Sequence, residues 1–221
     1  MLRENHLKDT MSLTIKLYYW PGACSMASQI LLADSGLAYE AIKINLQDPP
    51  ARAEYMRTLN PKGQIPTLVI DGEIITEGPA VITAISQLVP EKCYTGSTPM
   101  ENVRFYEWMN FLSGTVLTKS FGGLFKPSWY SDDPSAAEGI IAKSKVNISA
   151  GFQLIEDRLE KLSDPTHALG HSLTGVDAYL AVFITWANRF QIDISKYPNY
   201  RKLFDSISRT AAFKAAQEKQ V

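Results

Sequence analysis

Cys24 is the residue whose type and position best suit thiol chemistry. It follows a Pro-Gly break and lies at the start of a helix predicted over residues 25–35, which Gly36 would end. Because a helix N-terminus stabilises an anion, we expect the pKa of this thiol to be lowered, and the hydroxyl of Ser25 adds a hydrogen-bond donor beside it. The alternative is a small, buried, inert cysteine. No second cysteine follows three residues later, which excludes a CxxC dithiol oxidoreductase.

Glu77 and Gly78 open a second predicted helix, over residues 78–89. Backbone N–H groups at a helix N-terminus favour an anion, and a glycine lets a ligand carboxylate approach closely. The carboxylate of Glu77 could hold an ammonium group in the same turn. A site for both charges suits the head group of an α-amino acid. The alternative is that Glu77 only complements the helix dipole.

The elements that must position these residues alternate in type before residue 90. Predicted strands cover residues 15–19, 39–46, 65–70 and 73–76, and predicted helices cover residues 25–35, 52–59 and 78–89. The last two strands flank Asp71-Gly72, a pair typical of a tight hairpin turn. This order predicts a thioredoxin-like α/β domain with a mixed sheet over residues 15–89, after a disordered tail over residues 1–14.

Pro66 stands at the mouth of one predicted strand, where a proline is tolerated because no ladder donor is needed. In a thioredoxin-like domain a proline here is usually cis, and the turn leaves the N–H and C=O groups of Ile65 facing the active site. Such an edge can pair with an extended peptide ligand. A purely structural edge proline is the alternative.

The second half of the chain is almost entirely helical at a period of 3.6 residues. A linker rich in Pro, Gly, Ser and Thr covers residues 90–99. Thr174 and Asp177 predict a capping-box-like helix start. The sequence therefore predicts an all-helical domain over residues 100–221, with helices over 100–126, 134–162, 174–190 and 197–209 and from Phe213. An apolar substrate pocket at the domain boundary would be lined by Trp20, Leu117, Phe121 and Trp186.

Composition excludes several other classes of protein. Lys+Arg 22 against Asp+Glu 23 gives a net charge of −1, which does not favour nucleic-acid binding. The longest near-apolar run, residues 178–187, is about half of the ~20 residues that a membrane span needs. Two cysteines and three histidines make a metal site improbable, so we expect no metal. With no secretory signal and few cysteines, we expect the protein to be cytoplasmic.

Four segments carry a family resemblance: KLYYWPGACSMAS at residues 16–28, NPKGQIPTLVIDGEIITEGPAVITAISQLVP at 60–90, EWMNFL at 107–112 and SLTGVDAYLAVFITWA at 172–187. Together they resemble the cytosolic glutathione transferases, and in particular the beta class or a fungal relative of it. The resemblance implies the two-domain fold described above, a homodimer, and activation of the glutathione thiol for attack on an apolar electrophilic small molecule.

The same resemblance implies which residues hold the co-substrate glutathione. Ile65 would pair with its cysteinyl part, Pro66 would be cis, and Glu77 and Gly78 would take the γ-glutamyl end. Cys24 would face the glutathione sulfur, as a hydrogen-bond partner or by forming a mixed disulfide. The implied glutathione site is completed by Gln64 and Asn110.

The chain departs from the family pattern at several positions. The beta-class enzymes carry a histidine near position 119, where this chain has Thr118, or Leu117 if the register shifts by one, and no histidine lies between His6 and His167. Gly78 replaces a serine that is usual in the family. The lysine before the second helix is missing, for which Arg52 or Lys62 could substitute. Gly114 resembles a one-residue insertion, which predicts a π-bulge at the pocket wall.

Three functions are compatible with these residues. In the first, Cys24, Ser25 or a backbone amide lowers the thiol pKa of glutathione from about 8.5 by two units, which takes about 2.7 kcal/mol. The second is glutathione-dependent thiol–disulfide exchange through Cys24. The third is a non-catalytic protein that binds glutathione or an apolar ligand. We expect the first, with Cys24 and Ser25 as the catalytic residues.

Overall fold

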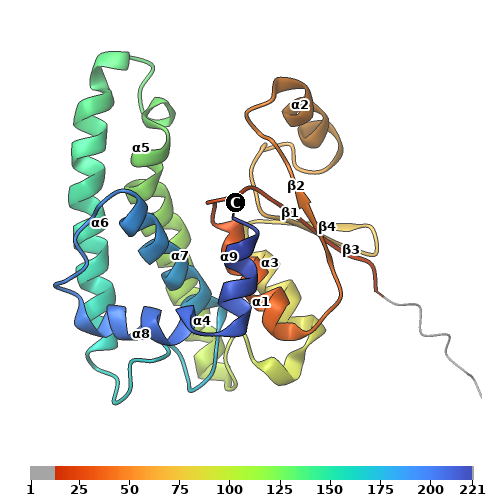
Figure 1. The fold of residues 1–221 in the computed structure, drawn as a ribbon, viewed down its shortest axis with the longest axis vertical. Coiled ribbons are helices and arrows are strands. Elements are labelled where there is room, and N and C mark those ends of the chain that lie inside the picture. Colours follow the sequence, from red (N-terminus) through yellow and green to blue (C-terminus); the bar gives the residue numbers. More distant parts are fainter. Residues whose placement is uncertain (1–12, 221) are drawn as a thin grey trace, which may run out of the picture.

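The computed structural model of the chain describes residues 13–220 (Figure 1). The tail expected over residues 1–14 therefore lies outside the described residues except for its last two. The Thr14 N–H donates to a carboxylate oxygen of Asp71 at 2.8 Å, and the Thr14 carbonyl accepts from the Asp71 N–H at 3.0 Å. Thr14 is thus fixed to a turn of the sheet, and the expected disorder does not extend to it.

A mixed four-stranded sheet underlies the N-terminal half of the fold. Its strands are β1 (Ile15–Tyr19), β2 (Glu40–Lys43), β3 (Thr67–Ile70) and β4 (Glu73–Thr76), in the spatial order β2-β1-β3-β4. β1 is parallel to β2 and antiparallel to β3, and β3 and β4 form the expected hairpin. β2 ends sooner than predicted because the chain turns at Asn45, whose carbonyl accepts from the Asp48 N–H at 3.2 Å.

Three helices accompany this sheet: α1 (Ser25–Ser35), α2 (Pro49–Thr58) and α3 (Gly78–Leu88). α1 ends at Gly36 with a φ of 74°, the left-handed cap that the sequence predicts. α2 begins before the predicted residue 52, because prolines are tolerated in a first helical turn and the Asp48 carboxylate caps it. The arrangement is the thioredoxin-like domain that we expected.

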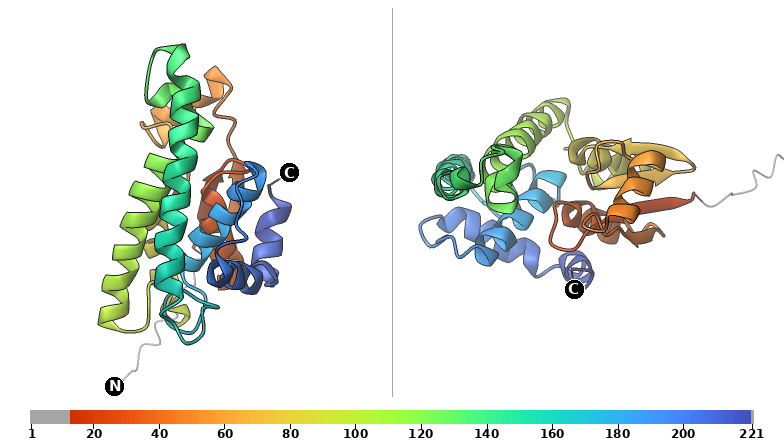
Figure 2. Two further views of the ribbon diagram at one scale, coloured as in Figure 1. Left: turned by 90° about the vertical axis from the view of Figure 1, so that its left-hand side faces the viewer. Right: turned by 90° about the horizontal axis from the view of Figure 1, so that it is seen from above.

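The rest of the chain is all-helical, which confirms the expected fold class. Its helices are α4 (Pro99–Asn110), the π-helix η2 (Phe111–Phe121), α5 (Gly122–Phe125), α6 (Ala137–Leu159), α7 (Gly175–Arg189), α8 (Pro198–Ser208) and α9 (Ala211–Glu218), with 3₁₀ turns at Pro90–Lys92, Pro127–Trp129 and Pro134–Ala136. α6 runs beside α4, η2 and α5 as a long pair (Figures 1 and 2). α7 packs against α1, and so does α9, so the two halves of the fold meet along α1.

The predicted single helix over residues 100–126 is wrong in one respect, since its middle is a π-helix of 11 residues. The π-bulge expected at Gly114 is confirmed and is longer than one turn. The hydroxyls of Thr118 and Ser120 donate to carbonyls five residues earlier, at 2.9 and 3.1 Å, as a widened helix allows. Leu117 and Thr118, in the middle of this π-helix, both border the cavity described below.

The start of α7 is held by buried polar contacts. A carboxylate oxygen of Asp177 accepts from the N–H and the hydroxyl of Thr174, both at 2.8 Å, and the other oxygen accepts from the Ala168 N–H at 2.7 Å. The expected capping box is confirmed. It anchors a helix that is buried over most of its length and that carries side chains into the site described below.

Two further expectations concern absences. Within residues 13–220, no helix is long and apolar enough to cross a membrane. In the same part of the chain, no three His, Cys, Asp or Glu side chains come together as a metal-binding group.

Candidate active site

A cavity of about 520 Å³ lies where the two halves of the fold meet. Its first wall consists of the β1–α1 loop, the segment before β3 and the start of α3. Its second wall consists of η2, α5, the following turn and α7. Of the residues expected to bind glutathione, this cavity brings together Cys24, Gln64, Ile65, Pro66, Glu77 and Gly78.

The thiol of Cys24 reaches this cavity and donates to the carbonyl oxygen of Ile65 at 3.6 Å. Burial raises its pKa to about 11, and the charge of Glu77 acts in the same direction, while the backbone amides of Cys24 and Ser25 oppose it. Our expectation of a lowered pKa is therefore wrong. The first turn of α1 does favour a thiolate, but desolvation outweighs it. Cys24 remains a neutral S–H donor at neutral pH.

Ser25 does not take the position that we predicted for a catalytic hydroxyl. Its side chain is fully buried, and its hydroxyl donates to the carbonyl of Trp20 at 3.4 Å. It is not among the residues that border the cavity. Helical geometry explains this outcome, because neighbouring residues of a helix point about 100° apart, and Cys24 takes the direction of the cavity.

The peptide bond between Ile65 and Pro66 is cis, as expected. The preceding segment is fixed by the carbonyl of Gln64, which accepts from the hydroxyl of Tyr55 and from the side-chain amide of Asn60, both at 2.7 Å. Among the described residues, the N–H of Ile65 has no hydrogen-bond partner. A rigid turn thus presents a free backbone donor to the cavity.

Glu77 and Gly78 occupy the end of the cavity at the start of α3. Glu77 has a φ of 69°, a conformation that costs a non-glycine residue roughly 1–3 kcal/mol and is often found at functional sites. Its carboxylate forms an ion pair with Lys62, and both side chains are substantially exposed. Exposed ion pairs contribute little stability, so a ligand ammonium can compete for this carboxylate. Lys62 is thereby engaged, and neither it nor Arg52 borders the cavity.

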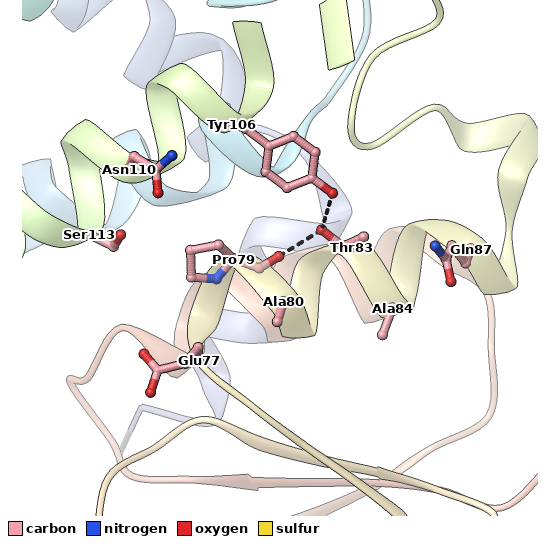
Figure 3. Close-up of a pocket in the computed structure, with 9 residues that line it drawn as sticks. All are labelled: Glu77, Pro79, Ala80, Thr83, Ala84, Gln87, Tyr106, Asn110 and Ser113. Atoms are coloured by element: carbon pink, nitrogen blue, oxygen red, sulfur yellow. Dashed lines mark hydrogen bonds between the residues drawn. The ribbon is translucent and has the colours of Figure 1, made fainter. Parts of the chain in front are cut away.

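Asn110 lies outside this cavity, contrary to our expectation. It lines a neighbouring depression of about 550 Å³ between α3 and α4. Figure 3 shows Asn110 and Ser113 on one side of this depression and Pro79 and Ala80 on the other, with Tyr106 directed toward Thr83. The hydroxyls of Tyr106 and Thr83 lie 3.2 Å apart. The two cavities share Glu77, Pro79 and Ser113, so Asn110 is adjacent to the expected site rather than part of it.

The expected apolar wall is mostly in place. Trp20, Leu117 and Trp186 border the cavity, and the indole N–H of Trp186 donates to the carbonyl of Gly22 at 2.9 Å. Phe121 does not border it. Its ring is fully buried and packs on Phe183, with ring centres 5.6 Å apart, because the π-helix turns it into the core.

The cavity also contains residues that our sequence analysis did not single out for this site. Phe125 and Trp129 extend the aromatic wall, while Tyr179 and Arg189 add a hydroxyl and a positive charge from α7. Thr118, which we expected near the position of the beta-class histidine, borders the cavity too, but its hydroxyl donates to the carbonyl of Ser113. Helical periodicity assigns Tyr179 to the core, and only packing shows that it reaches the cavity.

Fold and cavity together define a two-domain protein with a cavity between a thioredoxin-like domain and a helical domain. Comparison with known families identifies it. Residues 13–83 match the model "Glutathione S-transferase, N-terminal domain", and residues 134–210 match the model "Glutathione S-transferase, C-terminal domain". The chain belongs to the glutathione S-transferase family and is an enzyme of that kind.

Individual relatives agree with this assignment. Glutathione S-transferase GstA of Escherichia coli O157:H7 is 30% identical over 185 residues, which cover 81% of this chain and 86% of that protein. A probable maleylacetoacetate isomerase of Caenorhabditis elegans is 25% identical over 90% of each chain. The structure of a sphingomonad glutathione S-transferase complexed with glutathione superposes with a TM-score of 0.79 at 26% identity, over 93% of this chain and 98% of that one. Because the relatives include transferases and isomerases, the similarity does not single out the beta class.

Proposed function

We propose that the chain binds glutathione in the cavity between its two domains and activates the thiol for attack on an apolar electrophile. The observation that carries this proposal is the convergence of three features on one cavity: the cis turn at Pro66, the start of α3 and the thiol of Cys24. The N–H of Ile65 would bond the cysteinyl carbonyl of glutathione. The carboxylate of Glu77 would hold the ammonium group.

Cys24 acts in this proposal as a hydrogen-bond donor to the glutathione thiolate. Its S–H group, which now donates to the carbonyl of Ile65, would turn to the ligand sulfur, and the Ile65 carbonyl would accept the cysteinyl N–H instead. Such donors stabilise the thiolate, and lowering the thiol pKa by two units takes about 2.7 kcal/mol. The thiol proton leaves to solvent, and the sulfur then forms a bond to the electrophilic carbon as the leaving group departs.

The second substrate would lie against the aromatic wall. Trp20, Leu117, Phe125, Trp129 and Trp186 border the same cavity as Cys24, so an apolar molecule held there lies beside the sulfur. Two reactants held in contact gain a large part of their rate from proximity alone. This arrangement supports a flat or aromatic electrophile.

Calorimetry with glutathione and an assay of conjugation to 1-chloro-2,4-dinitrobenzene test the proposal. We expect binding and turnover by the wild-type protein, and a loss of both when Ile65→Pro removes the free backbone donor. Leu13→Ala, at an exposed position outside the cavity, is the control. Absence of glutathione binding by the wild-type protein would contradict the proposal.

A second candidate reaction is the glutathione-dependent isomerisation of a substrate that carries a carboxylate. The observation that favours it is Arg189, whose guanidinium borders the cavity and lies 5.8 Å from the ring centres of both Phe125 and Phe190. No ion pair to Arg189 exists among the described residues. Several relatives are named maleylacetoacetate isomerases. In this reaction the thiolate adds to a cis double bond, the bond rotates, and the thiolate leaves again. Turnover of a cis-enedione carboxylate tests it.

The thiol-exchange alternative receives less support. A cysteine whose pKa is raised to about 11 contains little thiolate at neutral pH, and the thiolate is the species that attacks a disulfide. Mass spectrometry after treatment with oxidised glutathione distinguishes thiol activation from thiol–disulfide exchange, because only exchange requires a glutathione adduct at Cys24. A non-catalytic binding protein would bind glutathione without turnover of any electrophile.

We also propose that the protein is a homodimer in the cytoplasm. Met100, Val103 and Tyr106 are exposed on α4, so this face of the helix offers apolar surface to a second copy. Both cysteines are free thiols, which suits a reducing compartment. Sedimentation of the wild-type protein and of Val103→Glu tests the dimer, because a charge on this face would weaken it.

A further inference from the structure

Tyr179 of α7 reaches across the domain boundary to the first residue of α3. A Cβ atom added at Gly78 would lie 1.7 Å from the Tyr179 hydroxyl oxygen and 2.9 Å from the ring carbon that carries it. The phenol therefore occupies the space into which any side chain at position 78 would point. Gly78 has no positive φ, so this contact is the reason that only glycine fits there.

The hydroxyl of Tyr179 has no hydrogen-bond partner among the described residues. Only 2% of the residue is exposed, yet among residues 13–220 no hydrogen bond joins its oxygen to another group. Two other buried tyrosines do have partners: Tyr200 donates to the carbonyl of Leu180 at 2.7 Å, and Tyr94 donates to Asp34 at 2.7 Å. Tyr179 borders the cavity, so a ligand there can supply the hydrogen-bond partner that this hydroxyl does not find among the described residues.

The start of α3 has no side-chain cap and one backbone donor fewer than most helix starts. No side chain caps it, and Pro79, its second residue, has no N–H group. An anion at this helix end therefore finds fewer backbone donors than usual, although the helix dipole still attracts it. The hydroxyl of Tyr179 adds a donor beside Gly78. Burial, with the nearby Cys24 and Glu77, raises the pKa of Tyr179, so the proton stays on the oxygen at neutral pH.

We propose that Tyr179 is a glutathione-binding residue whose hydroxyl donates to the α-carboxylate of the γ-glutamyl group at the start of α3. The inference rests on the proposed binding of glutathione in this cavity. It assigns to α7 a role in recognising the amino-acid end of the ligand, which the thioredoxin-like domain would otherwise bind alone. The hydroxyl of Tyr179 would thus take the role of the serine hydroxyl that the family usually has at the position of Gly78.

The decisive experiment compares two ligands on two proteins by calorimetry. The ligands are glutathione and γ-aminobutyryl-cysteinylglycine, which lacks only the α-carboxylate, and the proteins are wild type and Tyr179→Phe. A hydrogen bond to a charged group corresponds to about a 10- to 100-fold change in affinity. We expect Tyr179→Phe to weaken the binding of glutathione by about that factor and to change the affinity for the analogue by less than about twofold.

Tyr200→Phe is the matched control, because it also deletes one buried phenolic oxygen, on α8. It breaks a bond to the backbone, so we expect it to lower the melting temperature by about 2–4 °C and to leave both affinities unchanged. Tyr179→Phe breaks no bond within the protein and should melt as the wild type does. Gly78→Ala tests the same hydrogen bond in a second way, because the added Cβ would displace the Tyr179 phenol from its position beside residue 78. It should weaken glutathione more than the analogue.

Each outcome bears on one claim. Equal glutathione affinity of the wild type and Tyr179→Phe would overturn the role of Tyr179 alone. Equal weakening of glutathione and the analogue would also overturn it, because a merely structural effect does not distinguish the two ligands. If the wild-type protein bound no glutathione, the proposed function itself would fail.

Discussion

The raised pKa of Cys24 gives the sharpest test of the proposed chemistry. The experiment measures the rate at which iodoacetamide alkylates Cys24 as a function of pH. It uses the Cys93→Ser variant, so that Cys24 is the only thiol that can react. The structure raises the pKa of Cys24 from 9.0 to about 11. Near pH 8 the thiolate fraction then falls about a hundredfold, from roughly one in ten to one in a thousand. We expect alkylation of the folded protein to be about a hundred times slower than that of the urea-unfolded protein, with a midpoint near 11.

The same shift affects stability, and the sign follows from proton linkage. The folded state keeps the proton of Cys24 to higher pH than the unfolded state, so this group stabilises the fold below pH 9. That contribution is lost as the pH rises toward 11. Between these limits the wild type should lose up to about 2.7 kcal/mol more stability than Cys24→Ala, as measured by urea unfolding. A midpoint below 9 in the alkylation assay would refute the reasoning and would strengthen thiol–disulfide exchange through Cys24 as the alternative function.

Three further predictions concern residues that hold the site together. Asp177→Ala should destabilise the protein by about 3 kcal/mol or more in urea unfolding, because it leaves buried N–H groups, including that of Thr174, without an acceptor; a loss below about 1 kcal/mol would contradict this. Gln220→Leu should lower kcat with little change in glutathione affinity, because Gln220 accepts from the Gly22 N–H at 2.9 Å and so steadies the loop that carries Cys24; a change in affinity alone would count against it. Arg189→Leu should reduce kcat/KM about tenfold for an electrophile that carries a carboxylate and leave a neutral one unchanged; equal effects on both would exclude a charge-recognition role.

Local sequence signals were sufficient for the elements that carry the backbone part of the site. The Asp71-Gly72 pair predicts the hairpin and Gly36 predicts the end of α1, because each depends on the conformational limits of one or two residues. The cis bond at Pro66 was expected only once the order of the elements had indicated a thioredoxin-like domain. The apparent insertion at Gly114 relative to the family pattern predicted a π-bulge, although not the 11-residue length of the π-helix. Position along the chain likewise placed Cys24 and Glu77 beside helix ends.

Side-chain direction and environment were decided by the tertiary structure. Ser25 and Phe121 belong to the core because helical rotation and the widened π-helix turn them away from the cavity, and a short-range pattern does not fix that rotation. The pKa of Cys24 moves upward because burial outweighs the helix end, and burial depends on the domain packed opposite. Tyr179 reads as a core residue in the helical pattern, yet packing carries its hydroxyl to Gly78, about 100 residues earlier in the chain. The sequence by itself determined which backbone groups are offered to a ligand, while only the meeting of the two domains decided which side chains reach it.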